Sequence, residues 1–133
     1  MNDTTIILKT FNKQMTEFIE DINNLFPGEK DIIVLCTFMK TIMYGKPRMI
    51  INSWYTHVTE KYYDQIDNGE IQYFLNKDYS EDLENSDNSS EILEAIDKLR
   101  STLKRAFDED LNREKTIKYV QNLSKLSNLY YNN

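Results

Sequence analysis

Residues 4–25 read TTIILKTFNKQMTEFIEDINNL, and this stretch decides the fold class of the chain. Its larger apolar residues recur at alternating steps of three and four positions, at Leu8, Phe11, Met15, Phe18, Ile22 and Leu25. That spacing places them on one face of an α-helix. Asn2 or Asp3 can cap the start of the helix, and Pro27-Gly28 is expected to end it. The sequence therefore opens on a long amphipathic helix.

Two more helices are predicted before residue 67. The first covers about residues 29–44, is apolar over most of its circumference, and is expected to be central. The second begins near Pro47, which suits a first helical turn, and ends at the turn signal Asp67-Asn68-Gly69. Its inner face is formed by Ile51, Trp54, Val58 and Tyr62.

Two helices are predicted in the second half of the chain. One covers residues 91–107, with Asn88 placed to cap it. Asp108-Glu109-Asp110 are expected to open the other, at residues 108–130, because acidic residues suit a helix N-terminus. The two stripes consist of Ile92, Ile96, Leu99, Leu103 and Phe107, and of Tyr119, Leu123, Leu126 and Tyr130.

The helical blocks 4–66 and 91–131 are separated by two unlike segments. The central segment 70–79 is short and aromatic, and its pattern fits either helical turns or a packed extended chain. The acidic linker 80–90 consists mainly of Asp, Glu, Asn and Ser. Such a composition cannot repay the entropy of ordering, so a flexible loop is predicted.

The composition supports an all-α fold in a single domain, residues 1–133. Only three Gly and two Pro are present, whereas a β-sandwich needs many turns. Cys36 is the only cysteine and cannot form an internal disulfide. The longest apolar stretch, residues 32–44, contains Lys40 and is too short to span a bilayer. We expect a soluble, intracellular bundle of about five main helices with no membrane association.

Catalytic sets are missing from the sequence. Cys36 and His57 are the only thiol and imidazole, and Cys36 falls in an apolar helix, where a buried, inert thiol is expected. No glycine-rich phosphate loop or nucleophile motif occurs. We therefore expect a protein that is not an enzyme and that needs no cofactor.

A metal site is not predicted either, because one Cys and one His cannot form a zinc set. Asp78, Ser80 and Asp82 match the first alternate positions of an EF-hand loop. The match fails at Leu83, where Gly is needed, and at Ser89, where a bidentate Glu is needed. The acidic run is best explained as a solvated loop.

Tyrosine usage indicates protein binding. Adjacent tyrosines on a helix cannot all face one core, and exposed tyrosines are favoured anchors in protein interfaces. The alternative is that these amphipathic rings line the edge of the core. The candidate interaction residues are Tyr62, Tyr63, Tyr79, Tyr130 and Tyr131.

Basic residues allow a second interpretation, nucleic-acid binding. Lys115, Lys118 and Lys125 fall on one face of the last predicted helix, and Lys104 and Arg105 lie near them in sequence. Residues 98–125 hold eight bases and four acids, as a phosphate-binding patch requires. The net charge of −6 opposes long-range attraction of nucleic acid.

Four segments resemble small uncharacterised proteins of nucleocytoplasmic large DNA viruses, of the mimivirus and phycodnavirus kind. They are distributed along nearly the whole chain and are Phe11-Asn12 with Phe18-Ile19-Glu20-Asp21-Ile22, Leu25-Phe26-Pro27-Gly28-Glu29-Lys30-Asp31-Ile32, Phe74-Leu75-Asn76-Lys77-Asp78-Tyr79-Ser80, and Tyr119-Val120-Gln121-Asn122-Leu123-Ser124-Lys125-Leu126. The resemblance carries no catalytic residues. It implies that Phe74 and Leu75 plug the bundle, and that Lys77, Asp78 and Tyr79 fix the exit of the chain by hydrogen bonds.

The functional expectation follows from these features together. We expect a non-enzymatic viral helical protein that binds a viral or host protein, as a virion component or as a modulator of host proteins. The alternative is a nucleic-acid-associated factor of viral transcription or genome packaging. The resemblance implies host cytoplasm, viral factory or virion as the location. A Bcl-2-like bundle around a central apolar helix is a further alternative, although no Asn-Trp-Gly-Arg-type motif occurs.

Overall fold

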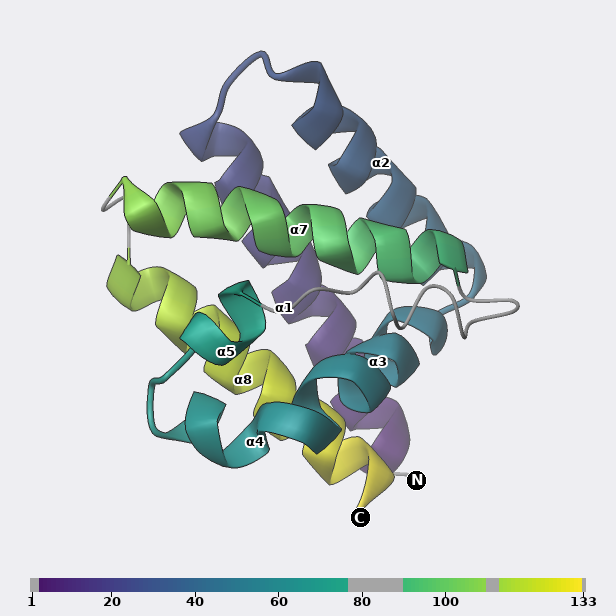
Figure 1. Cartoon of the computed structure of the whole chain (residues 1–133). Helices are drawn as coiled ribbons and strands as arrows, with labels where there is room; N and C mark the ends of the chain where they lie inside the picture. Colours follow the sequence, from purple (N-terminus) through teal and green to yellow (C-terminus); the bar gives the residue numbers. More distant parts are fainter. Residues whose placement is uncertain (1–2, 77–89, 110–112, 133) are drawn as a thin grey trace.

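The structure is a computed structural model that describes residues 3–76, 90–109 and 113–132, and in these ranges it is an all-α bundle without β-strands (Figure 1). This confirms the predicted fold class. The helices are α1 Asp3–Leu25, α2 Lys30–Gly45, α3 Met49–Trp54, the π-helical η1 Tyr55–Thr59, α4 Glu60–Asp67, the short α5 Gln72–Leu75, α7 Ser90–Asp108 and α8 Arg113–Tyr131.

The two glycines that end predicted helices do so in the left-handed conformation. Gly28 has φ +80° after α1, and Gly69 has φ +86° after α4. A side chain is strained at such angles, which is why glycine marks both turns. The predictions that Pro27-Gly28 and Asp67-Asn68-Gly69 break the chain are therefore confirmed.

Helices α1 and α8 form the longest contact of the bundle. They run antiparallel, so the start of α1 lies close to the end of α8 (Figure 1). Helix α7 crosses α1, and α2 lies at the edge of the bundle against α1, α3 and α7 (Figure 1). This arrangement leaves α2 with covering helices on one side.

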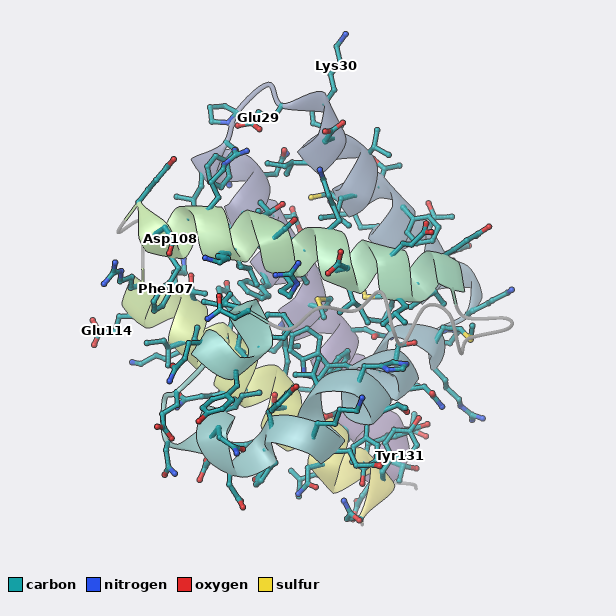
Figure 2. All side chains as sticks on the ribbon, in the orientation of Figure 1. Glu29, Lys30, Phe107, Asp108, Glu114 and Tyr131 are labelled. Carbon is teal, nitrogen blue, oxygen red and sulfur yellow. The ribbon has the colours of Figure 1, made fainter. Side chains whose placement is uncertain are left out.

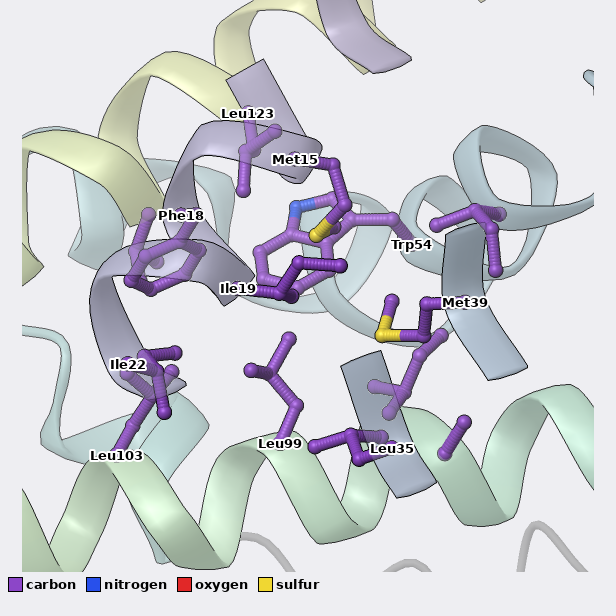
Figure 3. Packing of buried hydrophobic residues seen from close by; sticks show 14 of the residues in the cluster. Met15, Phe18, Ile19, Ile22, Leu35, Met39, Trp54, Leu99, Leu103 and Leu123 are labelled. Atoms are coloured by element: carbon purple, nitrogen blue, oxygen red, sulfur yellow. The ribbon is translucent and has the colours of Figure 1, made fainter. Parts of the chain in front are cut away.

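The core contains the predicted stripes of all the long helices. Trp54 lies at its centre with no exposed surface, among residues of α1, α2, α7 and α8 (Figure 3). Its indole N–H donates to Ser124 Oγ at 3.2 Å, and its ring lies 5.2 Å from that of Phe74. A buried indole needs such a hydrogen-bond partner, because an unpaired N–H is costly.

The predicted helix from Pro47 to residue 66 exists with a local distortion. It begins at Met49, widens into the π-helical turn η1, and has non-helical angles at Tyr62 (φ −131°, ψ 22°). In η1, the buried Thr59 shares a hydrogen bond of 2.6 Å with Ser127 of α8. A π-turn inserts one residue into the helical repeat and so shifts which side chains face the neighbouring helix.

Two expectations about the helices are wrong, and the conformation of part of the central segment is now defined. Asp108 ends α7 instead of opening the last helix, and its carboxylate forms an ion pair with Lys104 at 3.2 Å. Helix α2 is not central, since several of its side chains are exposed. The part of the central segment at Gln72–Leu75 is one helical turn, with Phe74 and Leu75 buried in the core as a plug.

Several predictions fall outside the described residues. These concern Lys77, Asp78 and Tyr79 of the central segment, most of the acidic linker with Ser80 and Asp82, and the capping role of Asn88.

Candidate functional site

Helix α2 has a buried inner face and an exposed outer face. Its inner face is buried against α1, α3 and α7 and consists of Ile32, Leu35, Cys36, Met39 and Met43. A second row of side chains is exposed along the length of the helix. We call this row, Val34, Thr37, Thr41 and Tyr44, the outer stripe.

The apolar members of this face are unusually open to solvent. Val34 is 65% exposed and Tyr44 is 93% exposed, and Ile33 next to the stripe is 44% exposed. Single exposed apolar residues are normal on a protein surface. Here they share one face of one helix, and adjoining apolar surface of this kind is typical of an interaction site.

A depression lies beside the outer stripe, between α2 and α7. It has a volume of about 400 Å³, and Val34 belongs both to it and to the stripe. Its floor and walls are largely aliphatic and aromatic carbon, with charged groups at the rim. We call it the α2–α7 groove; its lining residues are Asp31, Val34, Leu35, Phe38, Glu94, Ala95 and Lys98.

The position of α2 beside α7 is fixed at the start of α2. Glu29 pairs with Arg105 of α7, whose guanidinium lies 3.9 Å from the centre of the Phe26 ring. Two residues after Glu29, Asp31 pairs with Lys98 of α7 at 3.4 Å. Figure 2 shows Glu29 at this end of α2, while Lys30 points away from the protein.

The charged groups of the groove are two acids, Asp31 and Glu94, and one base, Lys98, which pairs with Asp31 at 3.4 Å. Lys40 is engaged with Glu20 at 3.9 Å on the side toward α1. The protein as a whole carries a net charge of −6. The α2–α7 groove is thus a mainly apolar part of an acidic protein, with a slight excess of acid at its rim.

The candidate tyrosines are mainly packed at the edge of the core. Tyr62, Tyr63 and Tyr130 are half-buried, and Tyr131 is 38% exposed; Tyr79 lies outside the described residues. Their rings lie against other tyrosines: Tyr131 is 4.6 Å from Tyr55 and 4.9 Å from Tyr130, and Tyr62 is 6.1 Å from Tyr73.

Tyr131, at the end of α8 (Figure 2), is packed closely enough against its neighbours that partial burial raises the pKa of its hydroxyl. The alternative that tyrosine rings line the core edge describes these positions better than a shared exposed surface does.

The candidate nucleic-acid residues are largely paired with acids. Lys115 lies 2.9 Å from Asp21, and Lys125 lies 3.8 Å from Asp67. Lys104 pairs with Asp108 of its own helix, and Arg105 pairs with Glu29, which precedes α2. Lys118 is exposed, beside Gln14 and Asn122 in an open depression between α1 and α8. A nucleic acid would have to displace these carboxylates before it gained the counterion-release energy that drives phosphate binding.

The most strongly perturbed titratable groups hold α1 to α8. The Tyr119 hydroxyl donates to Asp21 Oδ2 at 2.6 Å, and the Tyr119 ring stacks on Phe18 at 4.5 Å. This hydrogen bond, together with Lys115, lowers the pKa of the Asp21 carboxyl. Burial, followed by the bond to Asp21, raises the pKa of Tyr119. The lowered pKa of Asp21 means that the folded state favours its ionised form, whereas the Tyr119 hydroxyl stays protonated and remains the donor.

Cys36 is the buried thiol that the sequence predicted. Its Sγ donates to the Ile19 carbonyl at 3.2 Å, and burial raises the pKa of the thiol. His57 lies half-buried on η1. A thiol with a raised pKa is a poor nucleophile, because the thiolate is the reactive form.

Within the described parts of the chain, no group of three or more His, Cys, Asp or Glu residues could hold a metal ion. None of the helices in residues 3–76, 90–109 and 113–132 is both long enough and apolar enough to cross a membrane.

No family model, curated protein sequence or solved structure matches the chain. The class of protein that the fold and the surface define is an all-α bundle that presents one uncovered helix face. This face was missed in the sequence, although its signal was present: a helix that is apolar over most of its circumference either is central or has a second contact.

Proposed function

We propose that this chain is a non-enzymatic helical protein that acts by binding another protein through the outer stripe of α2 and the α2–α7 groove. The observation that carries the proposal is the exposure of Val34 and Tyr44 on a helix whose opposite face is already buried. Covering them removes apolar surface from water, which is the main favourable term in protein association.

The chemistry of the surface favours a helical protein partner. The groove lies between two helices and is lined by apolar side chains with two acids and one base at its rim. An amphipathic helix can place apolar side chains into such a groove and leave its polar face in water. With both signs of charge present and Lys98 paired with Asp31, the rim does not favour a strongly charged ligand.

A viral setting is part of the proposal, with the host cytoplasm, the viral factory or the virion as the location. Its support is the resemblance of four sequence segments to proteins of large DNA viruses. Either a virion component or a modulator of host proteins would use a surface of this kind, because both act through protein contacts.

The test compares two matched surface variants. Val34→Glu places a charge in the proposed site, whereas Ile6→Glu places the same charge on α1, at a residue that is 48% exposed. Both variants should fold like the wild type, as judged by circular dichroism. In infected or transfected cells, stoichiometric binding partners, including tagged copies of the chain, should be recovered with the wild type and with Ile6→Glu, and lost with Val34→Glu. Equal recovery with both variants would refute the proposal.

Nucleic-acid binding is tested in parallel with purified protein. The triple variant with Glu at Lys115, Lys118 and Lys125 removes the candidate patch, and Lys118 is its least paired member. We expect no retention of the wild type on DNA or RNA at low salt. Retention that falls with salt and disappears in the triple variant would favour the alternative function.

A further inference from the structure

The rim of the α2–α7 groove carries one carboxylate more than it has bases to pair with. The two acids that line the groove are Asp31 and Glu94, and the one base is Lys98. Lys98 lies one turn from Glu94 on α7, yet its ammonium group pairs with Asp31 at 3.4 Å. Within residues 3–76, 90–109 and 113–132, Glu94 takes part in no ion pair or hydrogen bond. The excess negative charge of the rim therefore resides on Glu94.

The other acids of α7 are compensated by local structure, whereas Glu94 is not. Glu91 lies in the first turn of α7, where the positive end of the helix dipole stabilises a carboxylate. Asp97 and Asp108 each pair with a base of the same helix, at 2.9 Å and 3.2 Å. Glu94 lies beyond the first turn, where the effect of the dipole has faded. Its charge is thus available to a molecule that lies in the groove.

Glu94 stands beside apolar surface. The apolar side chains that line the groove are Val34, Leu35 and Phe38 of α2 and Ala95 of α7. Leu35 and Ala95 are buried, whereas Val34 is 65% exposed. A partner that covers Val34 would also exclude water from one side of the neighbouring carboxylate. An ion pair formed there would be stronger than one formed in open water, because the local dielectric constant is lower.

These features select the sign of the partner's charge. A helix that covers the groove without a base would remove water from an unpaired carboxylate, which costs free energy. An acidic helix or a phosphate group would also be repelled by Glu94 and by the net charge of −6. A second copy of this chain would bring a rim whose single base is already paired. A Lys or Arg of a partner can pair with Glu94 while its aliphatic stem covers apolar surface.

We propose that the partner of the α2–α7 groove is an amphipathic helix with a basic residue beside its apolar face, and that this residue pairs with Glu94. This inference rests on the proposed function and adds the charge of the partner to it. Glu94 then determines specificity, while Val34 and its apolar neighbours supply most of the affinity. An ion pair at a partly exposed rim contributes little, so loss of Glu94 should weaken binding about two- to five-fold.

The experiment selects helical peptides on the purified full chain. The displayed library has an apolar face of Leu, Ile and Phe at helical spacing, and each position flanking that face holds Lys, Gln or Glu in equal amounts. The wild type should enrich Lys over Glu at one flanking position. Binding of the enriched peptide, called the Lys peptide, should be lost with Val34→Glu and kept with Ile6→Glu. Enrichment of Glu, or of neither residue, would overturn the inference.

Variants of α7 test whether Glu94 is the carboxylate that the Lys peptide meets. Glu94→Gln should weaken its binding about two- to five-fold at low salt, with a smaller difference in about 0.5 M salt. Glu94→Lys should prefer the peptide in which Glu replaces the selected Lys. The matched control is Glu91→Gln, which removes the same charge outside the groove and should leave the affinity unchanged. Equal weakening by Glu91→Gln and Glu94→Gln would contradict the assignment, because the peptide would then respond only to net charge.

The outcomes separate this inference from the proposed function. If peptides bind in a Val34-dependent way without preference for Lys over Glu, the charge of the partner is refuted and the proposed function stands. If no peptide binds in a Val34-dependent way, this inference is refuted. The proposed function is refuted as well only if partner recovery from cells is also independent of Val34.

Discussion

The α1–α8 contact and the α2–α7 contact are both formed by α-helices with apolar faces, but they differ in how far they remove apolar side chains from water. Between α1 and α8, the Phe18–Tyr119 stack and the bond from Tyr119 to Asp21 cover the apolar surface and satisfy the polar groups. Between α2 and α7, the Lys98–Asp31 pair lies at the rim of a groove that leaves Val34 open. Around Phe18 and Tyr119 the first contact buries its apolar side chains, whereas the second leaves Val34 exposed.

This difference separates stability from binding. Side chains between α1 and α8 are removed from water on folding, so changes there should act on the free energy of unfolding. Side chains on the outer stripe are still in water after folding, so changes there should act on association. Each of the following substitutions is chosen to test this division.

The largest effect is expected from Phe18→Ala in the α1–α8 contact. Phe18 is buried, and its removal leaves a cavity beside Tyr119, so the free energy of unfolding should fall by about 3–5 kcal/mol. The measurement is urea unfolding followed by circular dichroism, at a protein concentration that keeps the chain monomeric.

The matched substitution on the other side is Val34→Ala. Because Val34 is exposed, its loss should change the free energy of unfolding by less than about 0.5 kcal/mol. A cost for Val34→Ala close to that for Phe18→Ala would mean that the outer stripe is covered within the chain, and the comparison would fail.

The sequence predicted the complete contact better than the open one. The stripe from Leu8 to Leu25 has a single apolar line, so periodicity alone identifies its buried face, and Phe11, Met15 and Phe18 are buried. Helix α2 has two apolar lines, and periodicity does not say which of them another helix covers. That choice depends on where α7 lies, which local sequence does not encode.

Helix boundaries were predicted correctly where the backbone conformation requires a particular residue. Helix boundaries and distortions were missed where contacts between helices distant in sequence determine them. Gly28 and Gly69 adopt positive φ, so their turns were readable. The end of α7 was predicted to within one residue, but the start of the last helix was placed at Asp108 instead of Arg113, because Asp108 can serve either a helix start or an ion pair with Lys104. The π-turn at Tyr55–Thr59 has no local signal, since it accommodates Ser127 of a distant helix.

A smaller effect is expected from Asp21→Asn, which weakens the polar part of the α1–α8 contact. The Asp21 carboxylate accepts hydrogen bonds from Tyr119 and Lys115 and is partly exposed, so screening by water limits the loss to about 1 kcal/mol at neutral pH. Urea unfolding at pH 7 measures this loss.

The pH dependence of the same variant gives a sharper test. The pKa of Asp21 is lowered in the folded protein, so the folded state favours the ionised form. This stabilisation is present above the ordinary aspartate pKa of about 3.9 and is lost as pH falls through the lower folded-state value. The advantage of the wild type over Asp21→Asn should therefore shrink below about pH 4. An advantage that is unchanged at pH 3 would contradict the assignment.

The smallest effects on stability are expected from Lys125→Ala and Lys98→Ala, which remove one exposed ion pair on each side of the comparison. Lys125 lies 3.8 Å from Asp67, and Lys98 lies 3.4 Å from Asp31. Exposed pairs contribute about 0–1 kcal/mol and are screened by salt, so both variants should unfold within about 0.5 kcal/mol of the wild type in 0.5 M salt.

The two variants should nevertheless differ in association, because only Lys98 lies at the rim of the α2–α7 groove. Removing Lys98 leaves Asp31 and Glu94 at the rim without a base, so the surface that a partner protein meets becomes more acidic. At low salt, recovery of the protein partner from cells should therefore differ from that of the wild type for Lys98→Ala and not for Lys125→Ala, with the difference reduced in 0.5 M salt. Equal recovery of the partner with both variants at low salt would show that rim charge has no part in binding, and the apolar surface alone would then have to account for it.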